Sequence, residues 1–356
     1  MWNQTKITEL LGIQYPILQG PIGGFSTAEL LASVSNAGGL GSLGAYTLSP
    51  QEILEADKAI KAKTTKPYNI NLWVNDVDEA LANYSPAALE KIKLLFKPYF
   101  DELGIPLPEL SANIPSKFEN QLEALFTIRP AVFSFIFGIP SKEVLTESRR
   151  IGIKTIGTAT TIDEAYALEE ARVDAIVASG FEAGGHRPSF LRPAQDSLTG
   201  LFTLIQQLKS KINTPIIAAG GIADAKGIAA AFTLGADAVQ LGTAFLATDE
   251  SGATPLHKSM LFAEGSKYTT LSKSLTGRMG RMLPNTISDG IKFETEVLPF
   301  PLQSRLLAPL KVAALAQGRT DLISFWSGQN ATSLKHHKAG ELMQALIAET
   351  ENLLAI

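Results

Sequence analysis

The chain has 356 residues, of which 45% are hydrophobic and 19% charged, and its formal net charge is -4. This balance argues against the clustered basic face of a nucleic-acid-binding protein. Cysteine is absent, which excludes disulfides, cysteine metal sites and a thiol nucleophile. The apolar stretches at 215–221 and 228–234 are too short to cross a bilayer, and the first residues lack the pattern of a secretory signal. We expect a cytoplasmic monomer or homodimer that binds neither nucleic acid nor membrane.

Eight short apolar runs, several of them rich in β-branched residues, recur at 16–19, 39–43, 68–74, 131–135, 153–158, 175–178, 215–219 and 238–241. Continuous apolar runs suit parallel strands that are buried on both faces. Segments with helical spacing lie between them, at 27–36, 50–61, 141–150, 161–170, 198–209 and 224–234. This alternation predicts an α/β protein built from βα units. An open doubly wound sheet is the alternative, but eight units in sequence favour a closed (β/α)8 TIM barrel.

Two segments exceed a minimal barrel of about 250 residues. The first, at about 76–129, carries a helical pattern and a proline-rich loop, so we interpret it as an insertion. The second, at 246–356, contains several short helical patterns. We assign 1–245 to the barrel domain, and 246–356 to a smaller, mainly helical lobe whose end packs back on the barrel. Such a lobe could act as a lid over the βα-loop end, where TIM barrels hold their active sites.

Glycines follow the seventh and eighth predicted strands, where each strand gives way to a loop. Gly220 and Gly221 lie in the first loop, and Gly242 and Thr243 lie in the second. Glycine allows close backbone approach to a ligand, and bare N–H groups near a helix start can bind an anion. Tight turns alone would also use glycine. Because two such loops follow adjacent strands, we favour a phosphate site, which could belong to a cofactor or to a substrate.

One of the four histidines, His186, lies in the loop after the sixth strand, and the other three lie in the C-terminal lobe. A histidine at this place points at the barrel mouth, where its ordinary pKa of about 6.5 allows it to act as a base or a cation. Gly184 and Gly185 would let the loop fold closely around a ligand. Glu182 could be a partner of the imidazole or could cap the loop. A structural histidine bonded to backbone is the alternative, and we favour a functional one.

The first and third strands also end in candidate binding residues. The loop after the first strand contains Pro21, Ile22 and Gly23, and its glycines fit a close approach to a flat ring or, equally, a capped turn. In the third strand, Asn69 and Asn71 point to the same face. Asn71 could hydrogen-bond a cofactor, or both amides could belong to a buried polar network.

Several of these segments occur together, in order, in a known family. They are 19–46, YNINLWV at 68–74, VFSFIFGIP at 132–140, GFEAGGHR at 180–187, 215–251 and TGRMGRMLPN at 276–285, with FWSGQN at 325–330. In these motifs the chain resembles the nitronate monooxygenases. The likeness extends from about residue 10 to 285 and includes the C-terminal FWSGQN segment.

This resemblance implies a TIM barrel that binds FMN and no metal ion. It implies oxidation of alkyl nitronates, and possible use of nitroalkanes, with O2 to a carbonyl compound and nitrite. Carried over by position, His186 takes the place of the catalytic histidine and also faces the substrate. The implied FMN contacts include Asn71, Gly184, Gly221 and the run Gln240, Leu241, Gly242 and Thr243.

The chain departs from the family pattern at several positions. Ser179 replaces a frequent glutamine, so any side-chain bond to the flavin is lost or passes through water. Ile136 replaces a histidine found in many relatives, which makes an apolar wall of the substrate pocket. Ile22 stands for the usual methionine of the first loop, and Pro188 for a glycine. The apolar wall favours a bulkier or more apolar substrate.

The resemblance leads to a mechanistic hypothesis and to rivals. A protonated His186 would orient an anionic nitronate, whereas a neutral one could remove the α-proton of a nitroalkane. The nearest rival is an NAD(P)H-dependent FMN reductase, of the quinone or enoyl-acyl carrier protein type, on the same scaffold. A flavin-free barrel that acts on a sugar phosphate, and a non-catalytic binding barrel, are further alternatives. An active relative of IMP dehydrogenase is excluded, since no cysteine is present.

Overall fold

The computed structural model describes residues 2–293 and 296–354. Eight parallel strands form one sheet in the order β1-β9-β8-β6-β5-β4-β3-β2. A bridge between Leu18 and Leu40 brings β1 next to β2, so the sheet closes on itself. The predicted TIM barrel is therefore confirmed, and the open sheet is wrong. The strands are β1 (Ile17–Gln19), β2 (Gly41–Gly44), β3 (Tyr68–Trp73), β4 (Val132–Ile136), β5 (Lys154–Ala159), β6 (Ala175–Ser179), β8 (Ile216–Ala219) and β9 (Ala238–Leu241).

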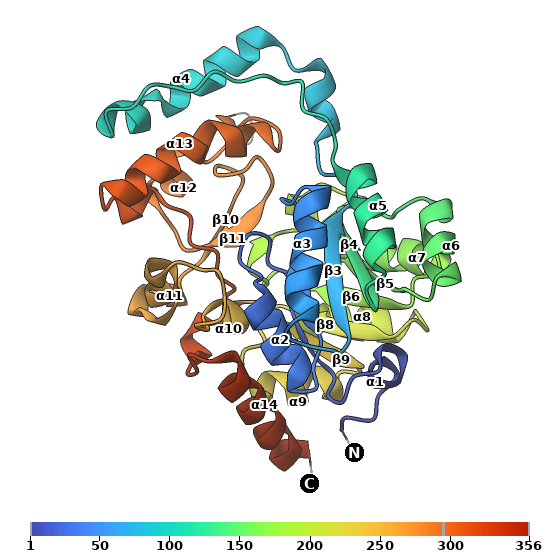
Figure 1. Cartoon of the computed structure of the whole chain (residues 1–356). Coiled ribbons are helices and arrows are strands. Elements are labelled where there is room, and N and C mark those ends of the chain that lie inside the picture. The colour runs from blue at the N-terminus through green and yellow to red at the C-terminus, as the bar shows by residue number, and fades with distance from the viewer. Residues whose placement is uncertain (1, 294–295, 355–356) are drawn as a thin grey trace.

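Helices surround the barrel (Figure 1). They are α2 (Ala28–Asn36), α3 (Pro50–Lys61), α5 (Phe118–Ile128), α6 (Lys142–Arg150), α7 (Ile162–Glu170), α8 (Leu201–Lys209), α9 (Ala225–Thr233) and α14 (Ala339–Leu354). Five of them begin after a side chain that accepts a hydrogen bond from the first turn: Thr27, Ser49, Ser141, Thr161 and Asp224. Such N-caps fix where a helix starts, and this is why these starts could be predicted.

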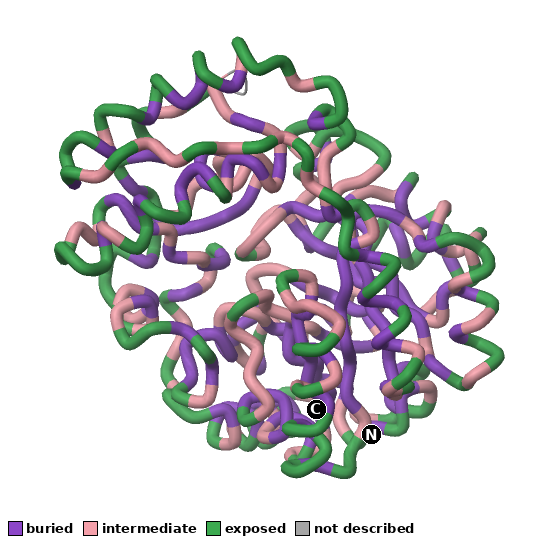
Figure 2. The backbone as a smooth tube through the Cα atoms, turned by 45° about the horizontal axis from the view of Figure 1, so that its top comes forward, coloured by how far each residue is buried: buried purple, intermediate pink, exposed green. Residues whose placement is uncertain are grey.

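The barrel has two layers of core. Buried side chains of the strands and the outer helices form the larger one, and Figure 2 shows the buried trace of the strands. A smaller cluster inside the barrel includes Leu18, Val132 and Ile217, and Ile7 of α1 (Lys6–Leu11) joins it. The helix α14 packs on α9 and α2, so the end of the chain lies against the barrel.

The segment after β3 divides between two parts of the molecule. Its helix α5 packs on α3 of the barrel, whereas α4 (Pro86–Glu102) packs on α13 (Leu302–Ala316). Phe96 and Phe100 of α4 share a buried cluster with Leu302 and Leu306 of α13. The inserted helix thus contributes to the core of the lobe, and Figure 1 shows it lying across that lobe.

The lobe contains a feature that its helical pattern did not predict. A three-stranded antiparallel sheet joins β10 (Thr270–Ser272), β11 (Gly280–Met282) and β7 (Gly185–His186). Because β7 belongs to the loop after β6, this sheet connects the lobe to the barrel mouth. The remaining short elements are η1 (Glu79–Asn83), η2 (Ala194–Asp196), α10 (Thr243–Leu246), α11 (Pro255–Phe262), η3 (Glu264–Lys267), α12 (Thr286–Gly290), η5 (Thr320–Leu322) and η6 (Ala331–Ser333). Among the described residues, no helix has the length and apolar character that a membrane span requires.

Candidate active site

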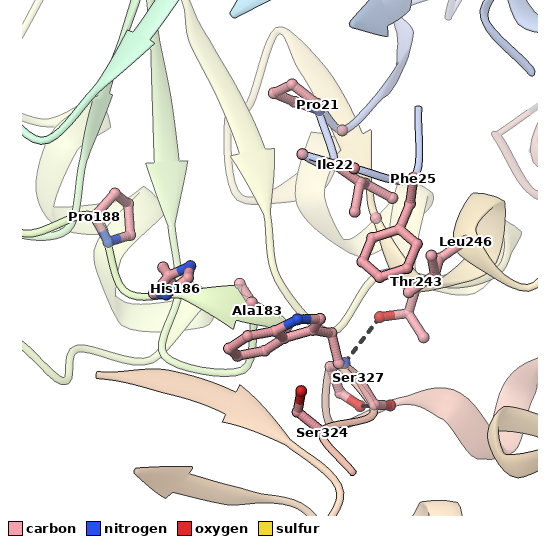
Figure 3. Close-up of a pocket in the computed structure, with 18 of the residues that line it drawn as sticks. Pro21, Ile22, Phe25, Ala183, His186, Pro188, Thr243, Leu246, Ser324 and Ser327 are labelled. Atoms are coloured by element: carbon pink, nitrogen blue, oxygen red, sulfur yellow. Dashed lines mark hydrogen bonds between the residues drawn. The ribbon is translucent and has the colours of Figure 1, made fainter. Parts of the chain in front are cut away.

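A cavity of about 550 Å³ lies at the carboxyl ends of the barrel strands, between the barrel and the lobe. Figure 3 shows it bordered by the loops after β1, β6 and β9 and by lobe residues such as Ser324 and Ser327. The structure brings almost all of the predicted site residues to this cavity. They are Pro21, Ile22, Gly23, Asn71, Ile136, Ser179, Gly184, Gly185, His186, Gly220, Gly221, Gln240, Gly242 and Thr243.

Leu241 is the exception among the predicted residues. Its side chain is fully buried in the core between the strands and the outer helices, away from the cavity lining. Successive residues of a strand face opposite sides, so Gln240 points into the cavity and Leu241 points away from it. The carbonyl of Leu241 is also occupied, since it accepts the N–H of Gly20 at 2.8 Å. The Leu241 side chain therefore does not line the cavity, contrary to the prediction.

The glycine loops after β8 and β9 form a cradle at one end of the cavity. Gly220 and Gly221 have φ angles of 120° and 69°, which residues other than glycine rarely adopt. A Cβ atom added to Gly242 would meet no atom within 4 Å, so the backbone there borders open space. These bare loops fit a phosphate group. At the start of α9, the N–H of Gly227 already donates to the carboxylate of Asp224. A phosphate would therefore be bound by the backbone amides of the loops rather than by the first turn of α9.

A segment of the lobe closes over this cradle. The N–H of Gly328 donates to the hydroxyl of Thr243 at 2.8 Å, as Figure 3 shows by a dashed line. The side-chain amide of Asn330 donates to the carbonyl of Gly221 at 2.9 Å. A Cβ on Gly184 would lie 2.5 Å from the nitrogen of Gly328, so only glycine permits this closeness. Sequence reasoning noted the FWSGQN segment but did not place it at the glycine loops after β8 and β9.

The loop after β1 is held by the side chain of Ser26, which belongs to the loop, and by the aromatic ring of Tyr46. The hydroxyl of Ser26 accepts the N–H of Ile22 at 3.0 Å. A Cβ on Gly23 would lie 2.2 Å from the ring of Tyr46, so the backbone packs directly on that ring. The sequence allows the glycines of this loop to approach a flat ring, and within the protein that ring is Tyr46. The ring of Tyr46 in turn stacks on Trp73, with 3.7 Å between the ring centroids.

The two asparagines of β3 have different roles. Asn69 donates to the hydroxyls of Ser42 at 3.2 Å and of Ser134 at 2.8 Å, so it belongs to a buried polar network inside the barrel. Asn71 also donates to Ser134, at 3.0 Å, but it borders the cavity. Its carbonyl oxygen therefore remains available to a ligand, given the amide orientation that this network sets.

The loop after β6 is anchored on both sides of His186. The buried guanidinium of Arg187 donates from Nη1 to the carbonyl of Ser179 at 2.6 Å and from Nε to the carbonyl of Ser197 at 3.0 Å. The carboxylate of Glu182 accepts the N–H of Leu201 at 3.0 Å. Glu182 therefore caps α8 and is not the partner of the imidazole. This contact, with Gly200 as N-cap, also explains why α8 begins at Leu201 and not at the predicted residue 198.

Aromatic rings surround the imidazole of His186. The ring centroids of Trp326 and Trp73 lie 5.0 and 5.1 Å from it, and those of Phe300 and Phe137 lie 6.1 and 6.4 Å away. Burial among these rings, with the nearby cation of Arg278 as the second cause, lowers the pKa of His186 to about 3. The side chain keeps partial exposure because it borders the cavity. At neutral pH the imidazole is uncharged, which suits a base and not a cation.

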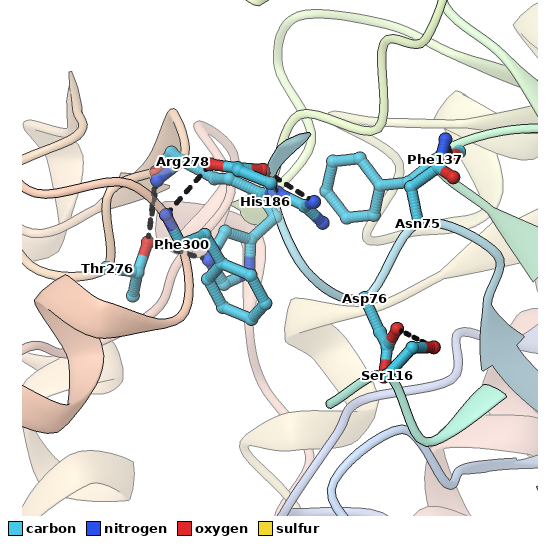
Figure 4. A network of polar contacts seen from close by, with 9 residues as sticks. Asn75, Asp76, Ser116, Phe137, His186, Thr276, Arg278 and Phe300 are labelled. Atoms are coloured by element: carbon cyan, nitrogen blue, oxygen red, sulfur yellow. Dashed lines mark hydrogen bonds and ion pairs between the residues drawn. The ribbon is translucent and has the colours of Figure 1, made fainter. Parts of the chain in front are cut away.

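Arg278 is the permanent positive charge beside the imidazole. Its guanidinium binds Asp78 through Nε at 2.8 Å and Nη2 at 2.7 Å, and lies 4.2 and 4.5 Å from the ring centroids of Phe137 and Phe300. Asp78 also accepts the N–H of Phe300 at 2.8 Å. Figure 4 shows this network, which joins the lobe to the segment after β3. Sequence reasoning missed Arg278, since only its place in TGRMGRMLPN marked it.

The depressed pKa of His186 has a consequence for stability. The unfolded chain, in which histidine has a pKa of about 6.5, binds more protons than the folded one between about pH 6.5 and pH 3. We therefore expect the free energy of unfolding to fall as the pH is lowered through this window. Chemical unfolding at several pH values should show a smaller fall for H186N than for the parent chain. Identical pH dependence of the two proteins would contradict the uncharged buried imidazole.

The part of the cavity inside the lobe is largely apolar. An aliphatic wall there, interrupted by two serines and one lysine, comprises Leu275, Ile287, Ser304, Leu307, Ala308, Leu310, Lys311, Leu322 and Ser324. The rest of the lobe's lining is Leu246, Thr276, Trp326, Ser327, Gly328 and Asn330. Ile136 adds a further apolar surface at the barrel side. A small organic molecule with an alkyl part would therefore fit between the imidazole and the lobe.

Comparisons with known proteins agree with this architecture. The profile of the family described as "Nitronate monooxygenase" matches residues 4–349. A "Probable nitronate monooxygenase" of Staphylococcus haemolyticus (strain JCSC1435) is 35% identical over 100% of this chain and 99% of its own length. Its counterpart in Staphylococcus aureus (strain Newman) is 34% identical over 99% of both chains.

Solved structures show the same relation. The nitroalkane oxidase from Streptomyces ansochromogenes is 33% identical, with a TM-score of 0.88 over 98% of both chains. FabK from Thermotoga maritima is 27% identical, with a TM-score of 0.75 over 99% of this chain and 97% of its own. The fold, the cavity and these relatives define an oxidoreductase of the TIM-barrel class. Within that class, the chain belongs to the nitronate monooxygenase family.

Proposed function

We propose that this protein uses FMN to oxidise alkyl nitronates, and the nitroalkanes that give rise to them, with O2 to a carbonyl compound and nitrite. The observation that carries this proposal is an uncharged histidine in an apolar aromatic site, at the same cavity as a glycine cradle fit for phosphate. Membership of the nitronate monooxygenase family supports the reaction class. The similarity to a nitroalkane oxidase supports the wider range of substrates.

The residues of the cradle would hold the cofactor. The amides around Gly220, Gly221 and Gly242 and the hydroxyl of Thr243 would bind the phosphate, and the carbonyl oxygen of Asn71 would contact the ring system. Ser179 also borders the cavity, but its short side chain reaches less far than a glutamine would. When bound, FMN supplies the electron transfer between the nitronate and oxygen.

His186 would supply the base for neutral substrates. An uncharged imidazole can accept the α-proton of a nitroalkane, while the electron pair of the C–H bond moves onto the nitro group and forms the nitronate. The new anion lies next to the new imidazolium, and this opposite charge favours the protonated form during the transfer. Arg278, fixed by Asp78, adds a permanent positive charge near the same place. A preformed nitronate needs no base, so His186 would serve mainly to position it.

The shape of the pocket favours substrates with an apolar part. Ile136 offers no hydrogen bond, and the lining in the lobe is mostly aliphatic. Trp73, Trp326 and Phe300 pack around the imidazole and would limit the access of water to a substrate bound beside it. We therefore expect longer or branched alkyl nitronates to bind better than the smallest ones.

A reductase that uses NADH or NADPH is the second candidate. It would use the same barrel scaffold, but the solved structure with the higher similarity is a nitroalkane oxidase, at 33% identity and a TM-score of 0.88, compared with 27% and 0.75 for FabK of Thermotoga maritima. We therefore rank nitronate oxidation first.

Steady-state assays separate the two functions. The protein with bound FMN should consume oxygen and release nitrite when supplied with alkyl nitronates, and the rate should increase with the alkyl chain. Oxygen uptake and nitrite are measured together, so that the chemical oxidation of free nitronate can be subtracted. If NADPH with a quinone or an enoyl thioester were turned over and nitronates were not, the reductase would be the correct function.

A further inference from the structure

The imidazole of His186 has a hydrogen-bond partner that determines which of its nitrogens carries the proton. Its Nε2 lies 2.9 Å from the hydroxyl oxygen of Thr276. The same hydroxyl donates to the carbonyl of Arg278 at 3.0 Å. A carbonyl oxygen can only accept, and a threonine hydroxyl has one hydrogen to give. With that hydrogen directed to the carbonyl, the oxygen of Thr276 must accept from Nε2–H of the imidazole.

The position of this hydroxyl is fixed by the turn that carries it. The N–H of Gly277 donates to the carbonyl of Lys273 at 2.8 Å, and the φ angle of Gly277 is 90°. A Cβ on Gly277 would lie 2.4 Å from the carbonyl oxygen of Leu298, so this turn is pressed against the neighbouring segment. Asp78 holds the side chain of Arg278. The carbonyl of Arg278, which accepts the hydrogen bond from Thr276, therefore lies in a turn that is restrained on both sides.

The other nitrogen of the imidazole is free. Within residues 2–293 and 296–354, no side chain or backbone group is hydrogen-bonded to Nδ1. In this region, the side-chain polar atoms that are fully buried without a hydrogen-bond partner are Asn69 Oδ1, Gln121 Oε1, Arg278 Nη1 and Thr350 Oγ1. Nδ1 of His186 is not one of them, so this nitrogen is not fully buried. Since His186 borders the cavity, Nδ1 is the nitrogen open to a ligand.

We propose that Thr276 is a positioning residue, which holds His186 in the Nε2–H tautomer and so leaves the lone pair of Nδ1 as the base. The proposal rests on the function proposed above for its catalytic part, whereas the tautomer itself rests on the hydrogen bonds alone. In the transfer, the C–H bond of the nitroalkane breaks, its proton bonds to Nδ1, and the electron pair remains on the nitronate. Thr276 stabilises the resulting imidazolium by accepting from Nε2–H.

Two substitutions of similar size test this role. T276V keeps the shape of the side chain and removes the hydroxyl, whereas T276S keeps the hydroxyl. The first readout is the nitrogen NMR spectrum of the FMN-bound protein labelled in histidine. The chain has four histidines, so the signals of His186 can be assigned by their loss in H186N. We expect a protonated Nε2 and an unprotonated Nδ1 in the parent and in T276S, and a mixture or reversal in T276V.

The second readout is the ratio of kcat/KM for a neutral nitroalkane to kcat/KM for its preformed nitronate. Loss of the group that orients a catalytic histidine typically costs at least about tenfold. We expect this ratio to fall by at least about tenfold in T276V and to recover in T276S. A merely structural role would lower both rates together and leave the ratio unchanged.

Two results would overturn the proposal: a protonated Nδ1 in the parent protein, or a spectrum and a ratio that T276V does not change. Failure of the proposed function looks different. If the parent turned over neither nitro compound, the function would be wrong, and the NMR spectrum would still decide the tautomer.

Discussion

H186N should retain its FMN and lose most of its activity on neutral nitroalkanes. General base catalysis contributes about 10² to 10⁴-fold to a rate, and an asparagine amide cannot take up the proton. Preformed nitronates do not need this step, so their oxidation should fall much less. The measurement is kcat/KM for a nitroalkane and for its nitronate, each with parent and variant, at one pH where both substrates persist.

A matched substitution controls for changes outside the site. His337 is exposed and does not border the cavity, so H337N should leave both rates as in the parent protein. The flavin spectrum of each variant shows that the cofactor remains bound. Equal nitroalkane activity of H186N and the parent would remove His186 from the role of base and leave it a structural residue.

The second large effect should come from the phosphate cradle. In G242D a carboxylate would extend into space that no other protein atom occupies within 4 Å of its Cβ, so the fold should tolerate it. The new negative charge would face the phosphate, and at least two charge-assisted hydrogen bonds would be lost, at about 1.5 kcal/mol or more each. That loss corresponds to an FMN affinity about 100-fold lower or more.

Fluorescence titration of the flavin-free protein with FMN measures this affinity. G265D is a suitable control, because Gly265 also has open space at its Cβ position but lies away from the cavity. Both variants should unfold at the same denaturant concentration as the parent when flavin is absent. If G242D bound FMN as tightly as the parent, the phosphate would have to bind elsewhere, and the cradle would lose its assignment.

Much of the barrel could be predicted from the sequence, because its signals are local. The strands are continuous apolar runs that must be buried on both faces, and side-chain caps such as Thr27 and Asp224 mark helix starts. The start of α8 was missed because its first free N–H is capped by Glu182, which is distant in sequence. The sheet of β7, β10 and β11 was missed because strands of two or three residues carry no periodicity.

The site could be predicted where it follows the ends of strands and not where two parts of the chain meet. His186 and the glycines of the cradle follow strands β6, β8 and β9, and the topology of a TIM barrel places such residues at one end. Leu241 was assigned to the cofactor by position, but the alternation of the strand turns it into the core. Thr276 and Arg278 act on His186 across about ninety residues, and no local pattern reveals such a contact.

If this cavity holds a flavin that takes electrons from nitronates, the absorbance of the flavin should report that transfer. The decisive experiment mixes the purified, flavin-loaded protein without oxygen with an alkyl nitronate, butyl 1-nitronate, and, separately, with NADPH, while the flavin absorbance is followed. We predict that the nitronate bleaches the flavin rapidly and that NADPH does so slowly or not at all. Rapid bleaching by NADPH and none by the nitronate, or a protein that binds no flavin, would show that this cavity does not serve nitronate oxidation.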